Sequence, residues 1–272
     1  MDGKTVVITG ASSGIGRAAA IELANQGAIV VPVGRDARRT ASVARKVGAE
    51  PVQADFYSLD EVRRTAQLLL GRHERIDVLV NNAGLVAGRR RLTADGLELT
   101  MAVNHFAPFL LTNLLLERLK ESQPARVVTT ASEAHRGGLL DMADLNGERR
   151  WSAWSAYGTS KLANILFTRA LARRLDGTGV VANCLHPGVI RTGLARGAPL
   201  PIRVGWRAAS VFFGSPRKGA ATLVYLASAP EAAGVSGGYF SDSLLATPSV
   251  QAQDDDLGEE LWTASERLVG LS

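Results

Sequence analysis

Short runs of apolar, often β-branched residues alternate along the chain with longer segments in which apolar residues recur every three or four positions. The first run is TVVIT at 5–9, and a helical pattern of apolar residues over 15–23 follows it after a glycine-containing turn. Apolar residues at helical spacing share one helix face, whereas short continuous apolar runs are typical of strands buried on both faces. The chain is therefore predicted to begin with a strand, a turn and a helix.

The same alternation continues to the end of the sequence. Strands that are separated by helices predict a parallel sheet with right-handed crossovers and helices on both faces, which is an α/β fold. We expect residues 1–272 to form one domain around this sheet. Strands are predicted at 28–33, 51–54, 77–82, 125–132, 180–188 and 238–240, and helices at 36–47, 58–72, 95–120, 153–176, 216–228 and 257–268.

Two stretches interrupt the alternation, at 133–152 and at 193–215. Loops longer than about 12 to 15 residues in compact domains are usually functional or disordered. Their apolar content argues against disorder, so we predict that both stretches form walls or a lid of a pocket.

The composition fits a folded protein of a reducing compartment. Hydrophobic residues make up 46% of the chain and charged residues 21%, and the single cysteine, Cys184, excludes a disulfide framework or a cysteine-based zinc cluster. We predict no metal site. MDGKTVVITG at 1–10 lacks the pattern of a signal peptide, and no apolar run approaches the roughly 18 residues of a membrane span. A cytoplasmic protein without an integral membrane segment is therefore expected.

The net charge of +5 raises the question of nucleic-acid binding. The arginines are spread along the chain, and the only tight group is Arg89-Arg90-Arg91. We interpret most of them as solvated residues of helix faces and predict no nucleic-acid partner.

Three glycines follow the first predicted strand and open the first predicted helix. Glycines at this point let a pyrophosphate approach the backbone, where the helix N-terminus supplies N–H donors and a positive dipole end. The fold is then a Rossmann-type doubly wound sheet that binds a dinucleotide, although a tight turn without a ligand has the same pattern. The predicted contacts are Gly10, Ser12, Ser13, Gly14, Ile15, Gly16 and Arg17.

The residue after the second strand indicates which dinucleotide is bound. An acidic residue there would accept hydrogen bonds from a free ribose, whereas Arg35 suits a 2′-phosphate, and Arg17 adds a second positive charge. NADP(H) is therefore predicted over NAD(H). Asp36 is the opposing sign, and we interpret it as the N-cap of the next helix. Asp55 either accepts from the adenine amino group or caps a helix.

Several motifs together resemble the short-chain dehydrogenase/reductase family over essentially the whole chain. They are TGASSGIG at 9–16, NNAG at 81–84, Ser132, YGTSK at 157–161 and HPGVIRT at 186–192. Four further segments resemble the family's retinol-dehydrogenase-like branch, namely VNHFAPFLLTNLLLERLK at 103–120, SKLANILFTRALARRL at 160–175, SGGYFSD at 236–242 and LWTASERLVGL at 261–271. The resemblance implies a nicotinamide-dependent oxidoreductase.

A carbonyl that receives hydride becomes an alkoxide, so an acid must lie beside it. Tyr157 is predicted to be that acid, and Lys161, four residues later on the same helix face, is predicted to stabilise its phenolate. The resemblance further implies that Lys161 binds the nicotinamide ribose, that Ser132 polarises the carbonyl and that Asn104 holds a water. The alternative for Tyr157 and Lys161 is an exposed pair on the helix surface without a role in catalysis. The alternative for Asn104 is a hydrogen bond to neighbouring backbone.

The resemblance also assigns the remaining cofactor contacts. Asn82, Ala83 and Gly84 would close over the adenine ribose side, while Pro187, Gly188 and Thr192 would pack on the nicotinamide and hold its carboxamide. Ordinary turns are the alternative for both segments.

Two histidines, His105 and His135, are not needed by this mechanism. We interpret His105 as a packed side chain and His135 as a residue of the pocket rim.

The substrate pocket is expected from the two irregular stretches. A gap of 25 positions separates Ser132 from Tyr157, which is longer than in most of the family and similar to the retinol-dehydrogenase-like branch. The aromatic and apolar residues of these stretches either line the pocket or pack the loops onto the body. They are Trp151, Leu194, Trp206, Phe212 and Phe213, together with Trp154, which directly follows the first stretch.

The function predicted from these features is an NADP(H)-dependent carbonyl reductase or alcohol dehydrogenase that acts on a hydrophobic or aromatic small molecule. Many animal members of the branch have an N-terminal membrane anchor that is not seen here, so a membrane retinoid is not assumed to be the substrate. The alternatives are a catalytically silent NADP(H)-binding redox sensor and dehydration or epimerisation on the same scaffold. Family habit suggests a homodimer or homotetramer.

Overall fold

The computed structural model describes residues 1–188 and 215–271. Within them, eight strands form one sheet in the order β3-β2-β1-β4-β5-β6-β7-β8, and every neighbouring pair except β7–β8 is parallel. The prediction of a doubly wound parallel sheet is confirmed. The strands are β1 (Thr5–Thr9), β2 (Ile29–Gly34), β3 (Val52–Gln53), β4 (Val78–Asn81), β5 (Ala125–Thr130), β6 (Val180–His186), β7 (Tyr239–Ser241) and β8 (Leu244–Ala246).

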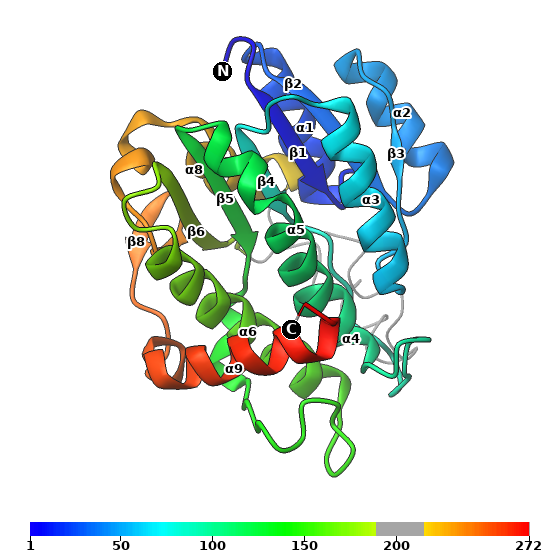
Figure 1. Cartoon of the computed structure of the whole chain (residues 1–272), viewed down its shortest axis with the longest axis vertical. Helices are drawn as coiled ribbons and strands as arrows, with labels where there is room; N and C mark the ends of the chain where they lie inside the picture. The colour runs from blue at the N-terminus through cyan, green and yellow to red at the C-terminus, as the bar shows by residue number, and fades with distance from the viewer. Residues whose placement is uncertain (189–214, 272) are drawn as a thin grey trace.

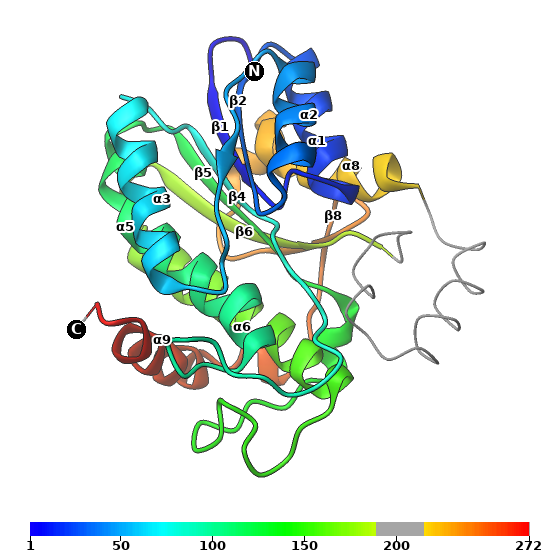
Figure 2. The same cartoon turned by 90° about the vertical axis from the view of Figure 1, so that its right-hand side faces the viewer.

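Helices cover both faces of the sheet (Figures 1 and 2). One face carries α1 (Gly14–Asn25), α2 (Ala37–Val47) and α8 (Pro216–Ser228), and the other carries α3 (Leu59–Arg72), α5 (Ala107–Glu121) and α6 (Ala153–Arg174). Helix α9 (Asp255–Val269) packs on α6, where Arg173 and Arg174 form ion pairs with Glu259 at 2.7 and 2.5 Å. The shorter elements are α4 (Leu99–Met101), η1 (Ala102–Phe106), η2 (Glu133–Gly137), η5 (Pro230–Gly234) and η6 (Gln251–Gln253).

Alternate side chains of the central strands pack into two separate apolar cores, one on each face of the sheet. Val6 and Ile8 of β1 pack into the core shared with α1 and α8, whereas Val7 packs into the core on the α3, α5 and α6 side. All three side chains are fully buried. This two-sided burial explains why the strands read as continuous apolar runs in the sequence.

The predicted helix at 95–120 begins later than expected and is not uniform. The Glu98 carboxylate accepts from the backbone N–H groups of Thr100 and Met101, both at 2.9 Å, and thereby fixes the helix start at Leu99. Residues 102–106 then form the π-helical turn η1 before α5 continues. Residues 91–98 are instead a turn, in which Leu92 pairs with Glu98.

Strand β8 was not predicted from the sequence. It joins β7 through the two residues Asp242 and Ser243, whose φ angles of 49° and 64° match the turn that favours a tight hairpin. Leu244 and Leu245 are 71% and 65% exposed, so the strand has no apolar alternation that a sequence pattern would detect.

The segment Leu99–Glu121 is the one described helix that is long and apolar enough to cross a membrane. However, 83% of its most apolar window is buried inside the protein. It serves here as a central core helix, and Phe106, Phe109 and Leu110 have no exposed surface.

Candidate active site

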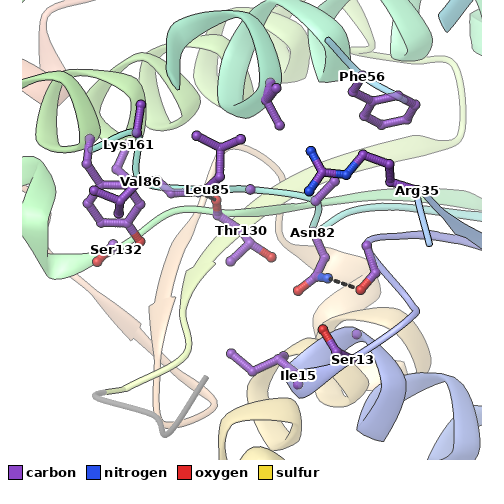
Figure 3. A pocket seen from close by; sticks show the side chains of 18 of the residues that line it. Ser13, Ile15, Arg35, Phe56, Asn82, Leu85, Val86, Thr130, Ser132 and Lys161 are labelled. Atoms are coloured by element: carbon purple, nitrogen blue, oxygen red, sulfur yellow. Dashed lines mark hydrogen bonds between the residues drawn. The ribbon is translucent and has the colours of Figure 1, made fainter. Parts of the chain in front are cut away.

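The carboxyl ends of β1, β2, β4, β5 and β6 meet along one edge of the sheet, and a cavity of about 800 Å³ opens there. Ligands of open α/β sheets bind at this edge. Figure 3 shows Ser132 and Lys161 at one end of the cavity and Arg35 at the other, with Leu85, Asn82 and Thr130 between them. The structure therefore brings most of the predicted catalytic and cofactor residues to a single site, although Asn104 and Arg17 do not line this cavity.

The turn between β1 and α1 requires glycine at particular positions. Gly10 and Gly14 have φ angles of 67° and 58°, in the left-handed region. A Cβ on Gly10 would lie 2.8 Å from the Cα of Ala83, and one on Gly16 would lie 2.6 Å from the Gly10 carbonyl oxygen. The turn and the start of α1 thus present bare backbone to the cavity, which fits a pyrophosphate.

Thr9 and Asn82 fasten this turn to the end of β4. The Thr9 hydroxyl accepts from the backbone N–H groups of Asn82 and Ala83 at 3.0 and 3.1 Å. The Asn82 side-chain amide donates to the Thr9 carbonyl at 3.0 Å, and in Figure 3 it points toward the glycine turn. Sequence reasoning missed Thr9, although a threonine directly before the glycine motif was a visible signal.

Arg35 lies where β2 ends, with its guanidinium 4.7 Å from the centre of the Tyr57 ring. Hydrogen bonding with Tyr57 raises the pKa of Arg35, so this group is a permanent cation on the cavity wall. The Asp36 carboxylate, which argued against NADP(H) in the sequence, is already bound within the protein. It caps α2 and accepts from the Arg39 backbone N–H and side chain at 2.9 and 2.7 Å. The interpretation of Asp36 as an N-cap is confirmed.

Two other charged residues are placed more precisely than the sequence allowed. Asp55 lines the cavity but does not cap α3, whose N-cap is Ser58. The Asp55 carboxylate instead accepts from the Tyr57 backbone N–H at 3.2 Å. The helix-cap alternative for Asp55 is therefore wrong. Arg17 is exposed and lies with Arg39 around a neighbouring cavity of about 350 Å³, next to the glycine turn.

Tyr157 and Lys161 project from one face of α6 and are buried, with exposed fractions of 7% and 3%. The alternative of an exposed surface pair is therefore wrong. Burial raises the pKa of Tyr157 to about 12, and hydrogen bonding with Ser132 partly lowers it. Burial lowers the pKa of Lys161 to about 8, and its Nζ donates to the Thr130 carbonyl at 2.8 Å. Lys161 Nζ lies 5.6 Å from the centre of the Tyr157 ring, and the stabilisation of the phenolate by this ammonium stays a prediction.

Asn104 lies in the π-helical turn η1 and is fully buried. Its Oδ1 accepts from the Leu85 backbone N–H at 2.8 Å, and its Nδ2 donates to the Leu85 carbonyl at 3.0 Å and to the Ser160 hydroxyl at 2.9 Å. The alternative in which Asn104 bonds neighbouring helix backbone is wrong. The side chain instead joins the loop after β4 to the helix that carries Tyr157.

The two histidines set aside in the sequence differ in outcome. His105 is buried among aromatic rings with Nε2 3.0 Å from the Ser265 hydroxyl, and burial lowers its pKa to about 4, so the packed-side-chain interpretation is confirmed. His135 is not a rim residue. It is buried, and its ring connects the Ser132 carbonyl, at 2.7 Å from Nδ1, to the Ser249 N–H, at 3.0 Å from Nε2.

The insertion at 133–152 is anchored beside the cavity. Trp151 donates from Nε1 to Glu98 at 3.1 Å, and Asn146 accepts through its side chain from the Glu98 N–H at 3.0 Å. Trp154 lines the cavity with its ring 6.3 Å from that of Tyr157. Of the insertion itself, only Glu133 and Ala134 line the cavity, whereas Trp151 packs against the core. Pro187 and Gly188 line another part of the cavity. Thr192, Leu194, Trp206, Phe212 and Phe213 lie outside the described residues.

Residues 4–200 match the short chain dehydrogenase family, and the chain belongs to this family of oxidoreductases. Its relatives include human retinol dehydrogenase 14, 43% identical over 298 residues that span 100% of this chain and 88% of that protein. A protein of Streptomyces sp. strain C5 named "Putative daunorubicin C-13 ketoreductase DnrU" is 46% identical over 277 residues, spanning 99% of this chain and 94% of that protein. The resemblance to the retinol-dehydrogenase-like branch is confirmed.

Solved structures agree with this assignment. An uncharacterized protein from Mycobacterium paratuberculosis superposes with a TM-score of 0.81 at 36% identity, covering 99% of this chain and 94% of that one. An NADP complex of RhlG from Pseudomonas aeruginosa superposes with a TM-score of 0.72 at 29% identity, covering 88% and 94%. A 3-ketoacyl-(acyl-carrier-protein) reductase from Brucella melitensis, complexed with NADH, has a TM-score of 0.69 at 26% identity, covering 88% and 96%. The family binds nicotinamide cofactors of both kinds.

Proposed function

We propose that this protein is an NADP(H)-dependent oxidoreductase that interconverts a ketone or aldehyde and the corresponding alcohol on a hydrophobic or aromatic small molecule. One observation carries the proposal: Ser132 and Lys161 lie at the end of the cavity opposite Arg35, and Tyr157 lines the same cavity with its ring centre 5.6 Å from Lys161 Nζ. When bound, the nicotinamide supplies or accepts the hydride. The residues of this chain bind the cofactor, orient the carbonyl and move the proton.

Tyr157 acts as the general acid in reduction. With a pKa of about 12 its phenol carries a proton at neutral pH, which it gives to the alkoxide formed from the carbonyl. Ser132, which hydrogen-bonds with Tyr157, orients the carbonyl oxygen toward it. The Lys161 ammonium supplies the positive charge that favours the resulting phenolate, and Asn104 holds the loop at Leu85 against the same helix.

The preference for NADP(H) rests on charge at the end of β2. Arg35 is a cation on the cavity wall, and the nearby Asp36 carboxylate is already bound by Arg39. A 2′-phosphate would thus meet a guanidinium rather than a free carboxylate. Backbone N–H groups of the glycine turn would hold the pyrophosphate.

The substrate class is supported by the pocket and by the relatives. Val86 packs with Tyr157, and the Trp154 ring lies 6.3 Å from the Tyr157 ring, so the catalytic end has an apolar wall. The relatives are named for retinol and for the C-13 ketone of daunorubicin, and both names refer to large molecules with an extended unsaturated or aromatic system.

The test is NADPH consumption over all-trans-retinal, daunorubicin and simple aryl ketones. Tyr157→Phe should lower kcat by about 100-fold to 10,000-fold, because it removes the proton donor, while leaving NADPH affinity within about twofold. Arg35→Ala should weaken NADPH binding by about 10-fold to 100-fold and NADH binding little, because it removes a charged hydrogen-bond donor. Undiminished turnover by Tyr157→Phe would refute the role of the tyrosine. Tight NADPH binding without turnover of any carbonyl would favour a redox sensor.

A further inference from the structure

His186 is the last residue of β6, and its ring is fixed in one tautomer. The Glu133 backbone N–H donates to His186 Nδ1 at 3.2 Å. A backbone amide can only donate, so Nδ1 carries no proton, and a neutral imidazole must then carry its proton on Nε2. Burial lowers the pKa of His186, so the ring is neutral at neutral pH.

Glu133, which holds this ring, is itself held from two sides. Tyr239 of β7 donates its hydroxyl to Glu133 Oε1 at 2.6 Å, and Arg136 donates from Nε to Oε2 at 2.7 Å. Because the Glu133 side chain is anchored to another strand, its backbone N–H is a rigid donor. The His186 ring is therefore preorganised before any ligand arrives.

The Nε2–H group of His186 has no protein acceptor among the described residues. The residue is 9% exposed and lines the cavity together with Ser132 and Tyr157. The contact at Nδ1 fixes the ring on the cavity wall, so its Nε2–H is available to an acceptor on a ligand. Ser132 directly precedes Glu133, so the donor lies on the same wall as the hydroxyl proposed to orient the reacting carbonyl.

We propose that His186 donates a hydrogen bond to a second oxygen of the substrate, on the carbon next to the reacting carbonyl. The preferred substrates are then α-hydroxyketones and 1,2-diketones. A simple ketone leaves the donor unpaired, and sites built around a buried donor reject analogues that lack the acceptor. This inference rests on the proposed function, since it assumes that a carbonyl reacts beside Ser132 and Tyr157.

The experiment compares 1-phenyl-1,2-propanedione with propiophenone, which differ in one carbonyl oxygen. His186→Asn keeps an acceptor near the Nδ1 position for the Glu133 N–H but loses the Nε2 donor, whereas His186→Gln places an amide N–H near the Nε2 position. The measured quantity is the ratio of kcat/KM for the dione to kcat/KM for the ketone, relative to wild type, which cancels their intrinsic reactivities. His186→Asn should lower this ratio about tenfold, and His186→Gln should restore a large part of it. His73→Asn, on a histidine at the end of α3, is the control and should leave the ratio unchanged.

Two outcomes would overturn the inference. Equal losses for both substrates in His186→Asn would mean that the ring only supports the wall. A loss of NADPH affinity with an unchanged ratio would mean that the donor serves the cofactor. If the wild-type protein turns over neither substrate, the proposed function fails. Calorimetry then measures how tightly the dione binds to the NADPH complexes of wild type and His186→Asn, which tests the hydrogen bond by itself.

Discussion

Gly16→Ala is a sharp test of the glycine turn, because the substituted methyl group would meet backbone. Its Cβ would lie 2.5 Å from the Asn82 amide nitrogen and 2.6 Å from the Gly10 carbonyl oxygen. The Asn82 side chain can move away, but the Gly10 carbonyl is part of the backbone of the turn and cannot move without it. The methyl group must therefore displace the turn or the first residues of α1.

The magnitude follows from two opposing effects. Alanine in a helix is favoured over glycine by about 0.5 to 1 kcal/mol, whereas overpacking typically costs about 1 to 3 kcal/mol. Overpacking wins, since rigid backbone is the neighbour. The net cost is then about 0.5 to 2 kcal/mol. In a protein of this size about 1 kcal/mol corresponds to roughly 2 to 4 °C, so Tm should fall by about 1 to 8 °C. NADPH affinity should fall by at least about tenfold, because the displaced amides no longer converge on a phosphate.

The assay is thermal unfolding followed by circular dichroism, together with NADPH titration. Gly71→Ala is the matched control, since Gly71 lies in α3 and a methyl group added there would have no atom within 4 Å, so Tm should stay level or rise by about 1 to 3 °C. Adding Asn82→Ala to Gly16→Ala should not restore NADPH binding, because the overlap with Gly10 remains. A Gly16→Ala protein that melts at the wild-type temperature and binds NADPH normally would refute the reasoning.

Two further predictions concern stability and reactivity. Burial alone would raise the pKa of Asp77, but hydrogen bonds from Lys4, the Thr5 N–H and Arg75 outweigh burial and lower that pKa. The ionised carboxylate therefore stabilises the fold at pH values above its unfolded pKa near 4, and this stabilisation is lost as the pH falls through the folded pKa. Asp77→Asn should therefore lower Tm at pH 7 and flatten its acid decline, and an unchanged acid limb would contradict this. Burial raises the pKa of Cys184 to about 12, so Ellman's reagent at pH 8 should label it only on unfolding, with Cys184→Ala as the blank; rapid labelling of the native protein would contradict its burial.

The parts of the site that could be predicted are those encoded by local spacing. Gly10, Gly14 and Gly16 stand in one short stretch between β1 and α1, and Tyr157 and Lys161 meet because four residues make about one helical turn. The partners of Asn104 could not be predicted, because Leu85 and Ser160 approach it only through tertiary packing around a π-helical turn. The donor role of His186 depends on the Glu133 N–H, which the parallel pairing of β5 with β6 brings close.

The π-helical turn at Ala102–Phe106 shifts the rotational phase between two parts of one continuous helical segment. A π turn holds one residue more than an α turn, so side chains before and after it point in directions that a regular helix could not reconcile. Asn104 can thus face Leu85 and Ser160 while Phe109 and Leu110 remain in the apolar core. Deleting one residue within the turn would make the segment a regular α-helix and rotate one part of it relative to the other. Either Asn104 would then lose its partners, or Phe109 and Leu110 would turn out of the core.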